Sequence, residues 1–222
     1  MFSVPSAFKG FINLIYPLHC QICKVKLDPA NTRYLCENCW NKVKKYCRNS
    51  SVCDEYFFNK IWSVGKYEGI LKECIHLLKY SKKSFIARPL GELMNSFIAN
   101  YPELKTIDFI TPAPLYSAKL RERGFNQSAE LAIRISERFN IPVSLNNLYR
   151  TRYTLSQTGL SRHERLLNVR AAFSVKNNPF LKKRVLLIDD VFTTGATVNE
   201  CSKTLLKAGA QTVRILTLAR GN

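Results

Sequence analysis

The sequence predicts an α/β fold, in which a central, mostly parallel sheet is flanked by helices, with a small separate segment at the N-terminus. Near the C-terminus, apolar stretches at residues 185–188 and 212–218 flank a helical stretch at residues 199–208. Two strands joined by one helix form a βαβ unit of a parallel sheet. The early part of the chain carries two closely spaced pairs of cysteines instead. We therefore expect an N-terminal segment, residues 1–55, and an α/β domain, residues 56–222.

The chain carries a large excess of positive charge. Its 222 residues include 34 Lys and Arg against 16 Asp and Glu, which gives a net charge of +18. Residues 111–184 alone contribute +10, whereas residues 185–222 contribute +1. This excess favours anionic partners, although a basic surface that only maintains solubility would have the same composition. No apolar run reaches the roughly 20 residues that a membrane-spanning helix needs.

The first 20 residues contain an apolar stretch that polar and proline residues interrupt. No clear small-residue cleavage site follows it, so we do not expect a signal peptide. Phe8, Phe11, Ile12 and Ile15 recur at helical spacing, which predicts a short amphipathic helix. Only one lysine lies near it, so packing on the protein body is favoured over contact with a membrane surface.

Four cysteines are arranged as C-x2-C-x12-C-x2-C, namely Cys20, Cys23, Cys36 and Cys39. This spacing presents two pairs of thiolates to one tetrahedral zinc ion. Disulfides are the alternative, which we disfavour because the chain lacks an export signal and a reducing compartment is expected. Such a zinc site would be structural, since a segment this short has little core of its own.

The remaining cysteines divide into two groups. Cys47 and Cys53 are too far apart for a second C-x2-C pair, so two free thiols are favoured over a second metal site. Cys74 and Cys201 lie in helical patterns, where we expect them to pack in the core.

From residue 61, strand and helix patterns alternate. IWSVGKYEGI predicts a strand followed by a turn, whereas LKECIHLLKYSKK and ARPLGELMNSFIAN have the apolar spacing of helices. Lys79, near the end of the first helix, is a candidate ligand for phosphate, although lysine is also favoured at a helix C-terminus for electrostatic reasons. His76, in the same helix, is assigned no chemistry.

Residues 107–116, IDFITPAPLY, predict a strand that runs into a proline turn, and RGFNQ then leads into an amphipathic helix. The carboxyl end of a parallel strand is a place where anions bind, and Lys119 and two arginines follow it closely. We expect pyrophosphate here, whereas a proline-rich connector with solvated arginines is the alternative. The candidate residues are Thr111, Pro112, Ala113, Lys79, Arg121 and Arg123.

Residues 150–173 are rich in arginine. Guanidinium groups interleaved with an aromatic ring suit the phosphate backbone and a stacked base of a nucleic acid. Tyr153, Gln157 and His163 lie between the arginines, and a loop that closes over a ribose phosphate would use the same residues. We assign no catalytic residue, since the sequence has neither an obvious triad nor a pair of acid/base carboxylates. The DNA-binding candidates are Arg150, Arg152, Arg162, Arg165 and Arg170.

The stretch VLLIDDVFTTGAT, residues 185–197, predicts a buried strand followed by two acids and a phosphate-binding turn. The hydroxyl and backbone N–H groups of the turn would meet the electropositive N-terminus of the next helix. A ligand with a phosphate and vicinal hydroxyls, such as ribose 5-phosphate, matches this combination. The alternative is an ordinary turn with surface acids. The candidate residues are Asp189, Asp190, Val191, Phe192, Thr193, Thr194, Gly195, Ala196 and Thr197.

Residues 185–197 closely resemble the phosphoribosyl pyrophosphate (PRPP) motif of type I phosphoribosyltransferases. The resemblance implies that Asp189 and Asp190 bind the ribose 2′- and 3′-hydroxyls and that the loop at residues 191–197 wraps the 5′-phosphate. It also implies a Mg²⁺ ion that bridges the ribose and the pyrophosphate.

Four features together resemble the competence protein ComF family: the four-cysteine segment, the proline turn with RERGFNQSAELA, the stretch RTRYTLSQTGLSRHERLLNVRAAF and the PRPP motif. The resemblance covers nearly the whole chain. It implies a type I phosphoribosyltransferase fold, an added zinc finger and a role in moving transforming single-stranded DNA into the cytoplasm.

We therefore expect a DNA-uptake protein that binds single-stranded DNA on a basic face and carries a PRPP-type pocket. An active, Mg²⁺-dependent phosphoribosyltransferase with an unknown acceptor is the alternative. The expected location is the cytoplasm, with the inner face of the cytoplasmic membrane, beside the DNA-uptake machinery, as a further option.

Overall fold

The computed structural model describes residues 17–28, 30–31, 33–43, 50–51, 55–80, 83–152 and 162–221. Its main sheet has the strand order β1-β2-β7-β6-β3. β2, β7, β6 and β3 are parallel to their neighbours, and only β1 is antiparallel. The bounds are β1 Ser50–Ser51, β2 Lys60–Lys66, β3 Phe109–Pro112, β6 Arg184–Phe192 and β7 Thr212–Arg220. The predicted α/β class with a mostly parallel sheet is confirmed.

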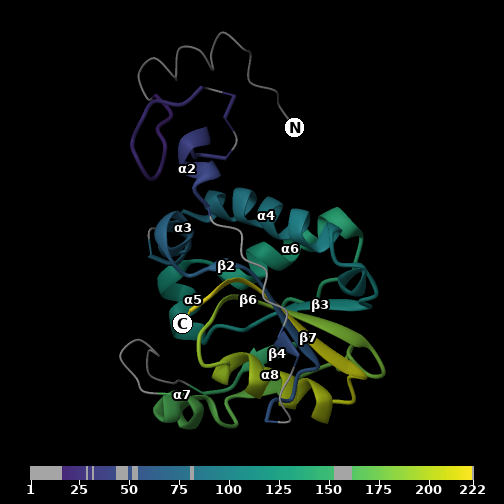
Figure 1. Cartoon of the computed structure of the whole chain (residues 1–222). Coiled ribbons are helices and arrows are strands. Elements are labelled where there is room, and N and C mark those ends of the chain that lie inside the picture. Colours follow the sequence, from purple (N-terminus) through teal and green to yellow (C-terminus); the bar gives the residue numbers. More distant parts are fainter. Residues whose placement is uncertain are drawn as a thin grey trace, which may run out of the picture.

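Helices cover both faces of this sheet (Figure 1). The helices α3, α4 and α6 lie on one face, and α8 lies on the other together with α7. A separate two-stranded antiparallel sheet, β4 with β5, also lies on the α8 side. The bounds are α3 Gly69–Tyr80, α4 Ala87–Ala99, α5 Ser117–Arg123, α6 Gln127–Phe139, β4 Leu148–Arg150, α7 Arg162–Val169, β5 Phe173–Val175 and α8 Ala196–Lys207.

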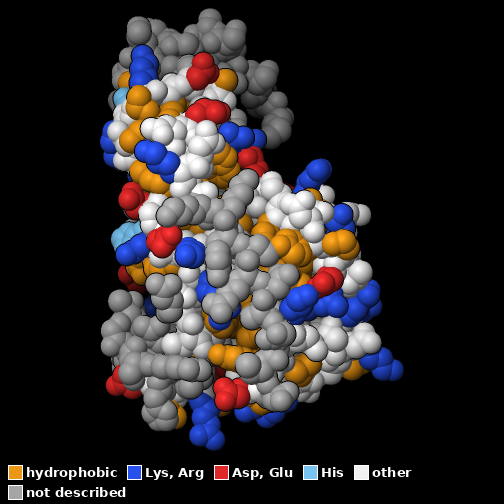
Figure 2. Space-filling model, viewed as in Figure 1, with side chains coloured by type: hydrophobic (Ala, Val, Ile, Leu, Met, Phe, Trp, Pro, Cys, Tyr) orange, Lys and Arg blue, Asp and Glu red, His pale blue; other side chains and the backbone are white. Residues whose placement is uncertain are grey.

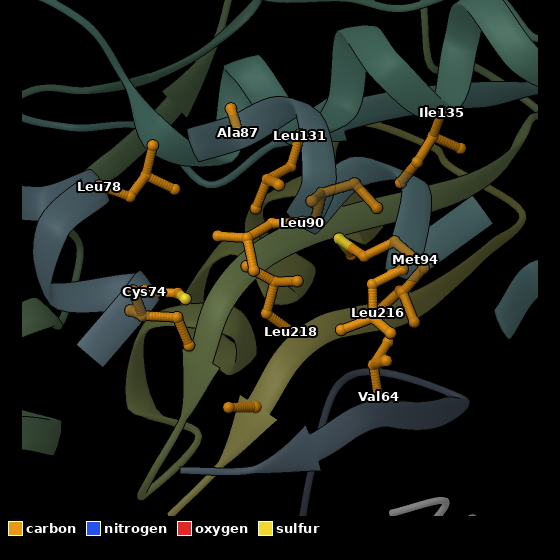
Figure 3. Packing of buried hydrophobic residues seen from close by; sticks show 14 of the residues in the cluster. Val64, Cys74, Leu78, Ala87, Leu90, Met94, Leu131, Ile135, Leu216 and Leu218 are labelled. Carbon is orange, nitrogen blue, oxygen red and sulfur yellow. The ribbon is translucent and has the colours of Figure 1, made fainter. Parts of the chain in front are cut away.

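The central strands are apolar on both faces because both faces are covered. Leu186 and Ile188 of β6 join the core under α4 and α6, whereas Val185 and Leu187 join the core under α8. Figure 3 shows side chains of α4 and α6 packed together over β7. This arrangement explains why residues 185–188 form a continuous apolar run instead of an alternating one.

The four-cysteine segment packs against α4. Its short helix α2, Glu37–Asn41, follows Cys36, and its buried residues Cys20 and Leu35 belong to the same apolar cluster as α4. Tyr34 lies with its ring centroid 4.3 Å from that of Phe85, in the 3₁₀ turn before α4. The segment therefore rests on the α/β body through apolar and aromatic contacts.

Some sequence predictions need correction at the ends of elements. The predicted strand at residues 185–188 continues to Phe192, because β7 pairs with it as far as Arg220. The predicted helix at residues 199–208 begins earlier, at Ala196, where Gly195 caps it in the left-handed conformation. The acids therefore lie within the extended part of β6 rather than after the strand.

Several sequence predictions fall outside the described residues: the amphipathic helix with Phe8, Phe11, Ile12 and Ile15, then Cys47 and Cys53, and finally Tyr153 and Gln157. The side chains of Arg162, His163 and Arg165 are likewise outside the description, although α7 includes their backbone. Cys74 and Cys201 are fully buried, as predicted. None of the helices in the described part of the chain combines the length and apolar character needed to cross a bilayer.

An ion pair fixes the start of β3 against the start of β6. The guanidinium of Arg184 binds both carboxylate oxygens of Asp108, with its Nη2 2.9 Å from Oδ1, and the backbone N–H of Arg184 donates to the same carboxylate. These bonds hold the pKa of Asp108 at about 2, below its ordinary value of 3.8. Because the folded-state pKa is depressed, the stabilisation is complete above about pH 4 and is lost as the pH falls toward 2.

Asp108→Asn is therefore expected to lower the Tm at pH 7, because it removes an ionised partner of Arg184. The Tm difference from the wild type should narrow between about pH 4 and about pH 2.5. Thermal melts monitored by circular dichroism would measure this Tm difference, with a substitution at an exposed acid, Asp28→Asn, as the control. A difference that stays constant over this pH range would contradict the assigned role.

Candidate functional site

A cavity of about 370 Å³ opens at the carboxyl ends of the parallel strands. β3 ends at Pro112, which pairs with Ile188, whereas β6 continues beside β7. The part of β6 beyond β3 therefore forms one wall, and the turn that starts α8 forms the floor beside it. All nine residues predicted from the PRPP motif, from Asp189 to Thr197, line this cavity.

Each acid of the predicted pair is held by its own contacts. The Asp190 carboxylate is almost completely buried, and its Oδ1 accepts the N–H of Val191 at 2.9 Å. Oδ1 of Asp189 accepts the Ser128 hydroxyl at 3.1 Å and the N–H of Asp190 at 2.9 Å. Burial and the neighbouring Asp190 raise the pKa of Asp189 to about 7, in spite of these hydrogen bonds and of nearby Lys79.

Lys79, a predicted candidate ligand for phosphate, lines the cavity and contacts a carboxylate. Its Nζ is 2.5 Å from Oδ2 of Asp190, and both side chains are largely buried. Burial alone would lower the pKa of Lys79, but the charges of Asp190 and Asp189 outweigh it and raise this pKa. The ammonium therefore stays charged and neutralises one member of the acidic pair.

The turn after β6 requires glycine at one position. Gly195 has φ +76°, and a Cβ there would lie 2.8 Å from ring atoms of Phe192. Its conformation starts α8, and the Thr194 hydroxyl accepts the N–H of Ala196 at 3.4 Å. The cavity thus contains a helix N-terminus, where backbone N–H groups and the helix dipole favour an anion.

Three further cations line the cavity: Lys119, Arg123 and Arg150. Burial, together with the nearby charges of Arg150 and Arg123, lowers the pKa of Lys119. Arg123 donates a hydrogen bond to the side chain of Gln127. Like charges gathered in this way repel one another, so an anion with several charges would relieve the repulsion.

Only some of the residues predicted to bind pyrophosphate line the cavity. Ala113, Lys79 and Arg123 line the cavity, whereas Arg121 does not. Thr111 is fully buried within β3, where its hydroxyl donates to the carbonyl of Ser144 at 3.0 Å. Pro112, the last residue of β3, is also absent from the lining.

The predicted DNA-binding arginines also lie in different places, one in the cavity and others outside it. Arg150 lines the cavity, and its guanidinium carbon lies 5.4 Å from the ring centroid of Phe173. Arg152 and Arg170 are exposed outside the cavity, where Nη2 of Arg152 donates to the carbonyl of Arg170 at 2.6 Å. This part of the chain therefore runs from the cavity to the outer surface.

Sequence reasoning missed residues that position the site. Asn126 donates to the carbonyl of Ala113 at 3.0 Å and accepts the N–H of Ser128 at 3.0 Å, so it joins the proline turn to the start of α6. Tyr67, Tyr80 and Gln127 also line the cavity. The motif RGFNQ contained the signal, since Asn before an amphipathic stretch is a favoured helix N-cap.

The four predicted metal ligands come together. The Sγ atoms of Cys20, Cys23, Cys36 and Cys39 all lie within 4.8 Å of one another. A tetrahedral zinc site with Zn–S bonds of about 2.3 Å needs sulfurs about 3.8 Å apart, so a small contraction suffices. All four thiols are free of disulfides. They can therefore hold a metal ion such as zinc.

Loss of Lys79 should leave a buried, uncompensated carboxylate. We expect Lys79→Met to lower the free energy of unfolding by about 3–5 kcal/mol. The double variant Lys79→Met with Asp190→Asn should recover most of this loss, because it removes both charges. Chemical denaturation at pH 7 would measure the free energy of unfolding of the wild type and both variants. A double variant that is less stable than Lys79→Met alone would contradict the pairing of Lys79 with Asp190.

Metal analysis tests the four-cysteine site. Untagged wild-type protein is expected to contain close to one zinc ion per chain, and Cys23→Ser should lose most of it. Cys74→Ser, at a buried position in α3, is the matched control and should keep the metal. A metal content near zero in the wild type would make the four cysteines ordinary thiols.

Solved structures of phosphoribosyltransferase-related enzymes overlay on parts of this chain. Glutamine PRPP amidotransferase from B. subtilis covers 63% of this chain and 26% of its own, with a TM-score of 0.39 and 24% identity. The overlay with a hypoxanthine-guanine phosphoribosyltransferase from Bacillus anthracis covers 60% of this chain and 70% of that enzyme, with a TM-score of 0.40 and 13% identity.

Curated relatives are more similar in sequence, whereas no family model matches the chain. Competence protein F of Haemophilus influenzae is 35% identical over 193 residues, which span 83% of this chain and 84% of that protein. Competence protein ComFC of Bacillus subtilis is 30% identical over 90% of this chain and 83% of its own. DNA utilization protein YhgH of Escherichia coli K12 is 32% identical over 73% of each. The chain therefore belongs to the competence protein F/ComFC family.

Proposed function

We propose that this protein takes part in DNA uptake, binds single-stranded DNA on a basic surface and holds a ribose phosphate in the cavity at the end of β6. The names of its relatives, competence protein and DNA utilization protein, support the role in DNA uptake. The observation that carries the pocket is its composition. An acidic pair, a helix N-terminus that starts at Gly195 and three cations surround one cavity.

Each part of PRPP has a counterpart in this cavity. The turn at residues 193–197 suits the 5′-phosphate, because backbone N–H groups at a helix start bind phosphate well. Asp189 and Asp190 suit the ribose hydroxyls as hydrogen-bond acceptors. Lys119, Arg123 and Arg150 suit the pyrophosphate, since cations bind such a polyanion strongly.

Mg²⁺ fits the same proposal. Its ligands are oxygens, which PRPP supplies and to which Asp189 can add, because Lys79 already neutralises Asp190. When bound, Mg²⁺ would neutralise charge between the ribose and the pyrophosphate. The chain's own cations would hold the pyrophosphate in place.

A second candidate function is transfer of the phosphoribosyl group to an acceptor. The cluster of Lys119, Arg123 and Arg150 favours it, since preorganised cations stabilise a departing pyrophosphate. The acceptor of such a transfer is unassigned. Turnover therefore remains a proposal separate from binding.

The remaining assignments are proposals of the same kind. The four-cysteine site holds structural zinc, and residues 1–55 form the unit around it. The protein works in the cytoplasm, and the DNA-uptake machinery at the inner face of the membrane is its partner. The names of the competence relatives support a partner in DNA uptake.

PRPP with Mg²⁺ is expected to raise the Tm of the wild-type protein. At a ligand concentration of 100 times Kd, the stabilisation should be about 2.7 kcal/mol. Asp189→Asn with Asp190→Asn should abolish this rise, because the amides weaken the contacts to the ribose hydroxyls. Thermal-shift measurements would test it, with the exposed Glu137→Gln as the control. An unchanged rise in the double variant would remove the assignment of the acidic pair.

A further inference from the structure

A second hollow lies outside the ribose-phosphate cavity. It is an open groove of about 520 Å³ between β5 and α8. Its residues come from the segment before β5, from β5 itself and from one side of α8. Nothing in the PRPP-type chemistry uses this groove.

The groove is lined by three cations and one acid. Arg170 lies on one side, and Lys203 and Lys207, one helical turn apart, lie on the other. The acid, Glu200, is already engaged, because its Oε1 accepts the backbone N–H of Ala171 at 2.9 Å. The groove therefore presents a net positive charge to a ligand, and its open shape suits a chain-like anion. Figure 2 shows that Lys and Arg side chains also occur elsewhere on the surface, so charge alone does not single out this groove.

Exposed aromatic rings next to lysines distinguish this groove from the other basic parts of the surface. Phe57 is 43% exposed, and its ring centroid lies 5.1 Å from Nζ of Lys203. Its backbone N–H donates to the side chain of Asn199 at 2.7 Å, which fixes this ring to α8. An exposed aromatic ring held beside a cationic groove is the arrangement on which the bases of a single strand stack.

A second ring of this kind lies on β4, the strand next to the β5 side of the groove. Tyr149 of β4 is 38% exposed and pairs across the small sheet with Ser174, which lines the groove. Nζ of Lys176 lies 5.7 Å from the ring centroid of Tyr149. An exposed aromatic ring with a lysine beside it thus occurs next to each side of the groove.

Arginines connect the groove with the ribose-phosphate cavity. Arg150 lines the cavity, Arg152 follows two residues later, and the guanidinium of Arg152 donates to the carbonyl of Arg170 at 2.6 Å. Arg170 in turn lines the groove. Arg150, Arg152 and Arg170 thus place positive charge at the cavity, next to the groove and in the groove.

We propose that the groove between β5 and α8 binds single-stranded DNA, with phosphates on Arg170, Lys203 and Lys207 and a base stacked on Phe57. The inference rests on the proposed binding of single-stranded DNA and names where that binding takes place. Flexible single strands expose their bases for stacking, whereas the bases of a duplex are already paired and stacked.

The test compares two charge-matched variants. Lys203→Gln with Lys207→Gln removes two groove lysines, and Lys42→Gln with Lys105→Gln removes two exposed lysines elsewhere. Fluorescence anisotropy with a labelled 20-nucleotide oligo(dT) gives the affinity at several salt concentrations. Loss of two phosphate contacts should reduce the slope of log affinity against log salt by about 1.4 in the groove variant only.

Phe57→Ala supplies a second, independent readout. Because base stacking is not ionic, this variant should weaken binding about five-fold or more and leave the salt slope unchanged. Oligo(rU) and a 20-base-pair duplex are measured alongside, and tighter binding of the duplex than of oligo(dT) would overturn the proposal. The Tm of each variant without ligand should stay close to the wild-type value, which would show that all these variants are folded.

The outcomes separate the two proposals. If the groove variant and Phe57→Ala bind oligo(dT) as the control does, the groove is not the site, although binding of single-stranded DNA still stands. If the wild type does not bind oligo(dT) at all, the proposed DNA binding fails and the groove fails with it.

Discussion

The placement of two consecutive carboxylates at the end of a buried strand is the constraint on which this structure depends. β6 extends past β3 because β7 pairs with it to the end, and Asp189 and Asp190 lie on that extension. A buried carboxylate is costly unless it is paired or hydrogen-bonded. Lys79 from α3 supplies the charge for Asp190, and Ser128 from α6 supplies a hydrogen bond for Asp189. Two helices are thereby tied to the same strand end, and the cavity forms between them and the start of α8.

The sequence alone predicts the parts of the site that are local. The acids, the glycine turn and the helix after it follow one another within thirteen residues, so strand, turn and N-terminus can be recognised together. The four cysteines are recognisable for the same reason, since metal ligands at fixed spacing need only a short backbone. The boundaries of β6 and α8 shifted by a few residues because pairing with β7 and the conformation of Gly195 decide them.

Contacts between distant elements were not predictable in this way. Lys79 is 111 residues before Asp190, and nothing in the helical pattern around it distinguishes a buried ion pair from a helix-end lysine. Arg150 was grouped with the DNA-binding arginines, yet the pairing of β4 with β5 places it in the cavity. A strand of three residues gives almost no periodic signal, and α5 was hidden in a stretch that resembled a proline-rich connector.

Because Arg150 lies in the cavity and Arg152 touches Arg170 outside it, the two proposed ligands would share one basic segment. Calorimetric titration of PRPP with Mg²⁺, in the absence and in the presence of saturating single-stranded DNA, tests this account most directly. We expect saturable binding of PRPP at one site per chain, with a Kd that changes when DNA is bound. An absence of PRPP binding under both conditions would contradict the ribose-phosphate pocket, and an identical Kd would show that pocket and DNA surface act independently.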